Sequence, residues 1–440
     1  MAWLMLLILT IFVITAYKLD GGDLLSPRFL LCLAILASYS VIIFNYKNWE
    51  VQISPKFILY VSTAIVAWIL GGALIKRLSK HSSRVVNNRL PLCNTCIKYK
   101  YPVNFFLILS VVLTFLYVFK LLSDAGAVGG FSAILRAIYE NTVNGYTPGF
   151  VFNQMREVVV AIAYVNTFRF FQRLFSKSDK ISIVKLLIPI AMDMVLILIT
   201  TDRNILLRYA IYLACLYVLF FRENKNFKNI NAAIVRRVAV MVIAVVAVFF
   251  VMGVAKQYTS NFARSISIYG GSGLYNFNLW LDNQTVSSTG SATFSTFLRV
   301  ISELLERIGV TTGWNTAARF DEYIIFTSSN GYVYSSNIYS ALKPFVEDMG
   351  YFGVVFFPFI LGVFYQWLYL RAKRNKYKFS WVLYCMLIYP VVFFPIAEQL
   401  FHRFTLGFVY EIAWLAIVYY GVYGKRRVVR TARRTVKVAQ

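Results

Sequence analysis

Charged side chains are scarce in this sequence: only 15% of its 440 residues are Asp, Glu, Lys or Arg. In soluble domains the share is roughly a quarter. Hydrophobic residues make up 59% of the chain and aromatic residues 17%. A composition this poor in charge excludes a chain of ordinary soluble domains and indicates a protein that is embedded in a membrane.

Histidine and cysteine are also rare, with two and five residues. Cys93 and Cys96 form a CNTC motif, but a zinc site needs a second pair of ligands, and His81 is the one other soft ligand nearby. The remaining cysteines fall in apolar runs, where free cysteine behaves as a small hydrophobic residue: Cys32, Cys215 and Cys385. We therefore expect no metal site and no cofactor.

Long apolar runs recur along the whole chain. About 20 apolar residues in a helix cross a hydrocarbon core of about 30 Å, and lipid offers a free backbone no hydrogen-bond partners, so such runs must be helices. The runs predict eleven spans, at 2–17, 28–45, 57–75, 103–122, 151–171, 183–200, 205–221, 238–254, 351–370, 380–397 and 404–423. We expect an all-α polytopic membrane protein with a single integral membrane domain over residues 1–440. Because the first run lacks a basic segment before it, it is interpreted as an anchor and not a cleaved signal.

Basic residues gather in every second polar segment: 76–102, 172–182, 222–237, 371–378 and the tail 424–440. Short loops rich in Lys and Arg stay in the cytoplasm. The alternation therefore predicts a cytoplasmic C-terminus and an N-terminus outside. It also explains the net charge of +26 through contact with membrane lipids, so no nucleic acid is expected as a partner.

The segment 255–350 is then a large extracytoplasmic loop. Within it, FSTFLRVISELLERIG (residues 294–309) puts apolar side chains on one helical face and charges on the other. Such a helix either lies along the outer interface or packs on the spans as a lid. YGGSG (269–273) is predicted to be a flexible turn and no phosphate loop, because no Lys or Ser/Thr follows in register.

Several charges fall inside apolar runs or beside them, where ionisable groups are costly and by default line a cavity: Arg156, Glu157, Asp193 and Arg208. Arg203 stands at the outer edge of a hairpin, where the positive-inside rule does not account for it. Together with Arg208 it predicts a cationic spot, and arginine grips phosphate with a rigid fork of donors. The alternative is that Arg203 pairs with Asp202 or reaches the lipid headgroups.

One stretch, SSNIYSALKPFVEDMGYFGVVFFPFILGVFYQW (335–367), resembles a segment of the oligosaccharide repeat-unit polymerases, the O-antigen and capsule polymerase (Wzy) family. Those proteins carry Asn-x-Tyr, an aromatic bridge, and an acidic motif with two glycines that enters a span. The matching residues are Asn337, Tyr339, Glu347, Asp348, Gly350 and Gly353. The family's Asp-Phe-Gly is Asp-Met-Gly in this chain.

Three further segments are similar to that family and occur in its order. DLLSPRF (23–29) resembles the Ser-Pro that opens the second span. TTDRNILLRY (200–209) is similar to an arginine turn shared with O-antigen ligases, although Asp202 stands where a Ser is usual. SIYGGSGLYNFN (267–278) resembles a Tyr-x-x-Gly stretch of the large outer loop.

The resemblance implies a glycosyltransferase-C-like helical bundle in the cytoplasmic membrane of a bacterium. It implies a glycosyltransferase that joins undecaprenyl-diphosphate-linked oligosaccharide repeats into O-antigen (lipopolysaccharide), capsule or exopolysaccharide on the outer face. A flippase and a chain-length regulator of the same pathway are the implied protein partners. No nucleotide sugar is needed, which agrees with the lack of a soluble nucleotide-binding segment.

The candidate site residues follow from this reaction. The leaving group is a lipid diphosphate, so cations on the outer side are expected to bind it: Arg203 and Arg264 first, then Arg136, Arg319 and Arg403. A carboxylate or His could act as general base: Asp348, then Glu347, Glu322 and His402. Asn337 and Tyr339 are the expected glycan contacts. The alternatives are that the acidic pair complements a helix dipole, that the two glycines allow close helix packing, and that the tyrosines anchor at the interface.

Two other activities use the same chemistry of binding. An O-antigen ligase shares the lipid donor, but ligases usually carry a His-centred motif in the outer loop, and residues 255–350 contain no His. A lipid-linked oligosaccharide flippase would be expected to show internal repeats and broken helices, and the sequence shows no repeat. These observations favour a polymerase.

Overall fold

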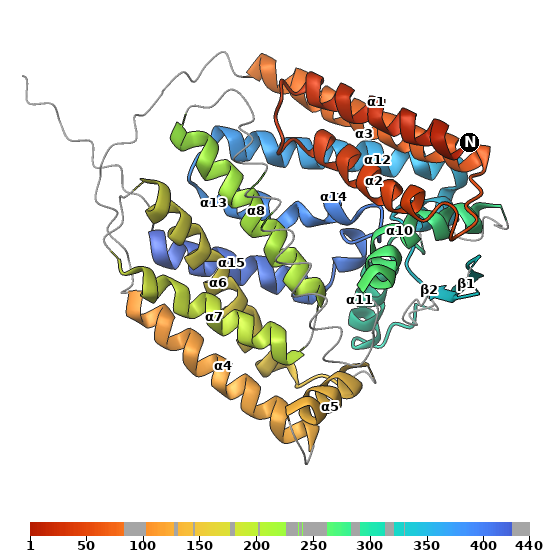
Figure 1. Cartoon of the computed structure of the whole chain (residues 1–440). Helices are drawn as coiled ribbons and strands as arrows, with labels where there is room; N and C mark the ends of the chain where they lie inside the picture. The colour runs from red at the N-terminus through yellow and green to blue at the C-terminus, as the bar shows by residue number, and fades with distance from the viewer. Residues whose placement is uncertain are drawn as a thin grey trace, which may run out of the picture.

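The computed structural model describes residues 1–82, 103–126, 131–143, 146–176, 181–200, 203–225, 236, 240, 262–282, 291–312, 321–329 and 331–424 (Figure 1). Within these ranges, nine helices are long and apolar enough to cross a membrane. The expected class, an all-α membrane protein, is confirmed.

Those nine helices coincide with nine of the predicted spans. They are α1 (Ala2–Leu19), α2 (Pro27–Phe44), α3 (Pro55–Ser82), α4 (Val103–Ala125), α6 (Phe150–Ser176), α7 (Ile183–Thr200), α8 (Arg203–Lys225), α12 (Leu342–Arg374) and α15 (Leu406–Tyr423). The span predicted at 380–397 is instead two short helices, α13 (Phe379–Leu387) and α14 (Tyr389–Phe393), with Pro390 in the first turn of the second. Proline has no N–H to continue a preceding helix, which explains the break. The span predicted at 238–254 lies outside the described residues.

The helices form two groups joined through α13. In one group α12 packs on α3 and α1 packs on α2; in the other, α6 contacts α4, α7, α8 and α15 (Figure 1). The contacts of α13 with α8 and with α12 link the groups. Large aromatic side chains fill the interior, with Trp68, Trp381 and Phe277 among the largest fully buried ones.

Glycine sets the distance between α3 and α12. A Cβ added at Gly71 would lie 2.2 Å from the Phe359 carbonyl oxygen, and one at Gly362 would lie 2.3 Å from that of Trp68. Neither gap admits a side chain, so the two backbones touch, as small residues allow in membrane helices. Trp68 then stacks on Tyr365 with ring centroids 5.6 Å apart.

A kink divides α12 at the acidic motif. Gly350 adopts φ 56° and ψ −137°, a conformation open to glycine and strained for other residues, and Met349 is also non-helical. The apolar part of α12 therefore starts at Tyr351, where the span was predicted to start. A Cβ at Gly353 would lie 1.9 Å from the Phe345 carbonyl oxygen, so this glycine allows the two parts of α12 to meet closely across the kink.

The loop end of the bundle carries α5 (Phe131–Val143), α10 (Phe262–Leu281), α11 (Ser295–Glu306) and a two-stranded antiparallel sheet of β1 (Ile324–Thr327) and β2 (Val333–Ser336) (Figure 1). We use "loop end" for this end from here on. The sheet was not expected from the sequence. Its strands pair Phe326 with Tyr334, and these two rings stack 5.2 Å apart.

The amphipathic helix predicted near residues 294–309 is confirmed as α11. Phe294, just before it, contacts the rings of Phe357 and Phe401 at 5.9 and 5.1 Å, so this end packs on the bundle. Further along, Leu304 and Ile308 are exposed. The helix is thus attached at one end and presents an apolar face at the other.

The turn predicted at YGGSG is wrong, because these residues lie in the middle of helix α10. Glycine has a low helix propensity, and here the close packing of α10 against its neighbours compensates for it. Gly270 and Gly271 lie against Val41 of α2, and a Cβ at Gly273 would lie 2.4 Å from the Pro395 carbonyl oxygen. These glycines allow α10 to approach its neighbours closely.

The opposite end, which we call the basic end, gathers the termini of helices that border the basic segments. Asp20 pairs with Arg28 and, at 3.0 Å, with Lys76. Asp23 pairs with Arg222 at 2.7 Å and Lys373 at 2.8 Å. The ends of α1, α2, α3, α8 and α12 thus meet, as the alternation of basic segments requires.

Candidate functional site

Six charged side chains gather in the half of the bundle nearer the loop end. They come from α6, α7, α8, α15 and the short 3-10 helix η2 (Phe401–Arg403). We call them the charged cluster: Arg156, Glu157, Asp193, Arg208, Arg403 and Glu411. Five of them line a cavity of about 150 Å³ together with Val160, Tyr164 and Ile205, and Asp193 is coupled to it electrostatically through Arg156 and Glu411.

Helix geometry explains why these residues meet. Arg156, Arg208 and Glu411 each lie near the start of their helix, and those helices begin at the loop end. η2 precedes α15 and brings Arg403 to the same level. Three regions distant in sequence, α6, α8 and the η2–α15 stretch, therefore contribute charges to one cavity.

Tyr389 of α14 holds two of the guanidinium groups. Arg208 lies over its ring at 4.8 Å and Arg403 at 5.2 Å from the centroid, which are cation–π distances. Arg403 also donates a 2.9 Å hydrogen bond to the Tyr389 hydroxyl, which in turn donates to the Gln399 carbonyl at 3.1 Å. Arg208 donates to the Gln399 side chain at 3.3 Å.

Arg403 keeps its charge in this setting. Burial alone would lower the pKa of its guanidinium, but the Glu411 carboxylate in direct contact raises that pKa above the ordinary arginine value. Arg403 is therefore a permanent cation beside the cavity, positioned by Tyr389 on one side and Glu411 on the other.

Asp193 is the least satisfied member of the charged cluster. Asp193 is 1% exposed, and neither of its carboxylate oxygens has a hydrogen-bond partner among the described residues. A buried polar group without a partner costs free energy that a ligand or a proton could recover. Such a group, close enough to Arg156 to interact with it, suits a site that binds an anion and handles a proton.

The residues expected to bind diphosphate are distributed over the molecule. Arg403 lines the cavity. Arg203 is the first residue of α8, on the turn before Arg208, but its side chain lies outside what the structure describes, as does all of Arg319. Arg264 donates to the Val333 carbonyl at 2.6 Å and lies over the Tyr334 ring, so it joins α10 to the sheet. Arg136 is exposed on α5 and pairs with Glu140 at 2.8 Å.

The preferred base, Asp348, is 4% exposed and does not line the cavity. It accepts hydrogen bonds from the backbone N–H groups of Ala292 (2.8 Å) and Thr293 (2.7 Å). His402 reaches the same segment, with its Nε2 atom 3.1 Å from the Ala292 carbonyl oxygen. In this structure Asp348 and His402 thus hold the segment before α11, and no acidic residue lies in the first turn of α12.

The backbone of η2 is held by Glu398. Its carboxylate accepts from the N–H groups of Leu400, Phe401 and His402 at 2.8 to 2.9 Å. Burial raises the pKa of Glu398, while His402 and these N–H groups act in the opposite direction. This carboxylate fixes the turn that carries Arg403.

The other candidates lie around Lys343 of α12. Glu347 is 3.8 Å from the Lys343 ammonium, and Tyr339 lies under that ammonium at 3.7 Å and donates to the Glu322 carbonyl at 2.9 Å. Asn337 immediately follows β2. This group sits at the loop end, outside the residues that line the charged cavity.

Sequence reasoning missed Glu411, Tyr389 and Gln399. Glu411 could have been found by the rule that identified Asp193, because it is a carboxylate inside an apolar run. Tyr389 and Gln399 give no such signal, since their role depends on how α14 packs against α8. Comparison with protein-family models, curated proteins and solved structures finds no match to this chain.

Proposed function

We propose that the protein is a membrane glycosyltransferase of the polysaccharide-polymerase type. It joins undecaprenyl-diphosphate-linked oligosaccharide repeats on the outer face of the cytoplasmic membrane of a bacterium. The observation that supports this most is the cavity lined by Arg156, Arg208 and Arg403 in the loop-end half of the bundle.

The reaction needs cations in such a place. An acceptor hydroxyl oxygen attacks the anomeric carbon of the donor, the carbon–oxygen bond to the diphosphate breaks, and the lipid diphosphate leaves with its added negative charge. Preorganised donors aimed at this charge lower the barrier, and removing one costs about 10²–10³ in rate. Arginine suits the role because its fork of donors matches phosphate oxygens.

The same cavity supplies acceptors for the proton that the hydroxyl loses. Glu157 and Glu411 line it, and Asp193 has free hydrogen-bonding capacity close by. A general base must come within hydrogen-bond reach of that proton. We assign this role to one of these carboxylates in preference to Asp348, whose oxygens bind two backbone N–H groups.

The test uses lipid-linked repeats extracted from cells in which the gene is deleted. Purified protein in proteoliposomes is expected to convert them into a ladder of longer glycans, resolved on a gel. Arg208→Gln should slow ladder formation about 10²–10³-fold. Arg77→Gln, which removes an exposed arginine of α3 that does not line the charged cavity, is the matched control and should leave the ladder unchanged.

Three results would contradict the proposal. Equal rates for Arg208→Gln and wild type would remove the site. Transfer to a different acceptor without any ladder would indicate a ligase, and movement of repeats across the bilayer without new glycosidic bonds would indicate a flippase.

A further inference from the structure

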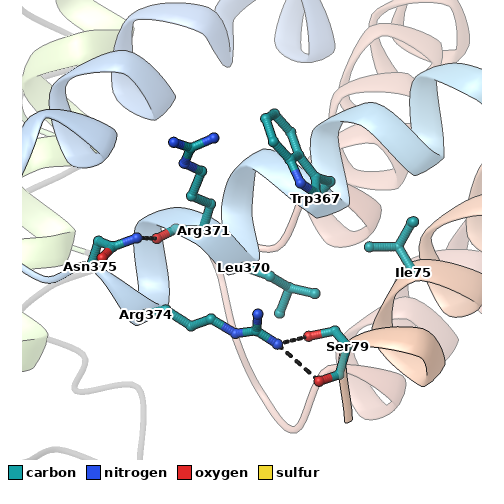
Figure 2. Close-up of a pocket in the computed structure, with 7 residues that line it drawn as sticks. All are labelled: Ile75, Ser79, Trp367, Leu370, Arg371, Arg374 and Asn375. Atoms are coloured by element: carbon teal, nitrogen blue, oxygen red, sulfur yellow. Dashed lines mark hydrogen bonds between the residues drawn. The ribbon is translucent and has the colours of Figure 1, made fainter. Parts of the chain in front are cut away.

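A second cavity lies at the basic end, between the last turns of α3 and α12 (Figure 2). Its volume is about 240 Å³, and its lining is Ile75, Ser79, Trp367, Leu370, Arg371, Arg374 and Asn375. Pockets that enclose a whole drug-sized ligand are larger, about 300–1,000 Å³. This cavity therefore suits part of a molecule, such as a headgroup.

The polar part of the lining is cationic. Arg374 donates to the Ser79 carbonyl at 2.9 Å and to the Ser79 hydroxyl, which closes one side of the cavity (Figure 2). Arg371 lies over the Trp367 ring at 5.4 Å and has no carboxylate partner among the described residues. Of the described residues that line the cavity, none is acidic. An anion is the ligand that this lining favours.

The apolar part of the lining continues along the outside of the bundle. Trp367 is 45% exposed. Leu74 (44%) and Leu78 (57%), which flank the lining residues of α3, are also exposed. On α12, Ile360, Trp367 and Arg371 recur at helical spacing on one face. A cationic pocket therefore joins an exposed apolar surface on two helices that are long and apolar enough to cross a membrane.

We propose that this cavity binds the phosphate headgroup of an anionic membrane phospholipid, with its acyl chains along the exposed faces of α3 and α12. Basic pockets between helices near a membrane surface bind such headgroups, and arginine beside tryptophan suits the level where headgroup and chain meet. A soluble phosphate would use the guanidinium groups but leave the adjoining apolar surface unused. The site is independent of the charged cluster and of the reaction proposed for it.

Native mass spectrometry of the purified full-length protein, titrated with phosphatidylglycerol in detergent, tests the proposal. Wild type should retain phosphatidylglycerol more strongly than phosphatidylcholine. Arg371→Gln should weaken phosphatidylglycerol binding about tenfold, because a charge-assisted hydrogen bond is lost. Arg77→Gln is the matched control, since Arg77 is exposed on α3 near the same end but does not line the cavity.

A second variant removes space and leaves the charge. Ile75→Trp should fill the cavity and also release the lipid. The proposal is overturned if Arg371→Gln and Arg77→Gln bind phosphatidylglycerol equally, or if phosphatidylcholine binds as well as phosphatidylglycerol. It is also overturned if inorganic phosphate alone displaces the lipid at comparable concentration, because the site would then serve a soluble anion.

Discussion

Helix α8 connects two groups of charges, each around a buried aspartate, that are built in different ways. Near its start, Arg208 belongs to the charged cluster around a cavity of about 150 Å³. Near its end, Arg222 pairs with Asp23 at 2.7 Å, where Lys373 also binds the carboxylate at 2.8 Å and Tyr369 donates a hydrogen bond. At the basic end the carboxylate has several hydrogen-bond partners; at the loop end the carboxylate of Asp193 has no hydrogen-bond partner among the described residues.

This difference in hydrogen bonding distinguishes a contact that stabilises the fold from a site that can bind a ligand. A buried carboxylate whose hydrogen bonds are complete holds helices in one arrangement and leaves nothing for a ligand to bind. Buried charges around empty space are retained at a cost in stability, and such residues in membrane proteins mark pathways and sites. The two aspartates, Asp23 and Asp193, are both nearly inaccessible, at 3% and 1% exposure. They therefore provide a matched pair for experiments.

The largest effect on stability is expected for Asp23→Asn. The substitution leaves Arg222 and Lys373 without their carboxylate at the junction of α2, α8 and α12. Because the side chains of Arg222 and Lys373 are 38% and 44% exposed and can be hydrated once the carboxylate is gone, we expect a loss of roughly 1–2 kcal/mol in the free energy of unfolding. Thermal unfolding in detergent measures it, with Lys18→Gln, an exposed cation near the same end, as the control. A variant as stable as wild type would show that these contacts are weak.

The second prediction uses pH to break the same contact. Burial by itself would raise the pKa of Asp23, but Arg222 and Lys373 together lower it below the ordinary value of 3.8. A lowered carboxyl pKa adds stability that is present above the unfolded pKa and is lost as pH falls through the folded pKa. The stability difference between wild type and Asp23→Asn should therefore be constant near neutral pH and shrink below pH 3.8. A difference that persists at lower pH would contradict this assignment.

Much of the fold followed from the sequence because lipid leaves few structural choices. An apolar run that crosses a membrane must be a helix, so nine predicted spans coincide with helices among the described residues. The errors lie where packing between distant segments decides. YGGSG is helical because its glycines pack closely against α2 and against the backbone of Pro395. The predicted span at 380–397 breaks at Pro390. Neither contact can be read from local sequence.

The sequence predicts that charged residues form a site among the helices, but not which residues belong to it. Arg156, Glu157, Asp193 and Arg208 stand out because charges in apolar runs are costly. That rule does not say which charges share a cavity. Arg403 joins them through η2 and Tyr389, far along the chain from Arg156, while Arg264 turns to the sheet. The sequence prediction chose arginines by the side of the membrane on which their loops were expected, whereas most residues that line the cavity lie on helices.

The smallest effect on stability, and the sharpest comparison with Asp23, is expected for Asp193→Asn. Asparagine has nearly the shape of aspartate but removes a buried charge whose oxygens have no hydrogen-bond partner among the described residues. The lost attraction to Arg156 and the relieved desolvation oppose each other. We therefore expect a stability change within about 1 kcal/mol, unlike the loss at Asp23.

Activity should respond in the opposite order. If Asp193 accepts the proton or orders the arginines for the lipid diphosphate, Asp193→Asn should slow ladder formation about 10²-fold or more, since general-base catalysis contributes roughly that much. Asp23→Asn, assayed at a temperature where it stays folded, should retain most of its rate per folded molecule. Equal activity losses in the two variants would mean that both aspartates act only by holding helices together. The different hydrogen bonding of Asp23 and Asp193 would then say nothing about which of the two takes part in the reaction.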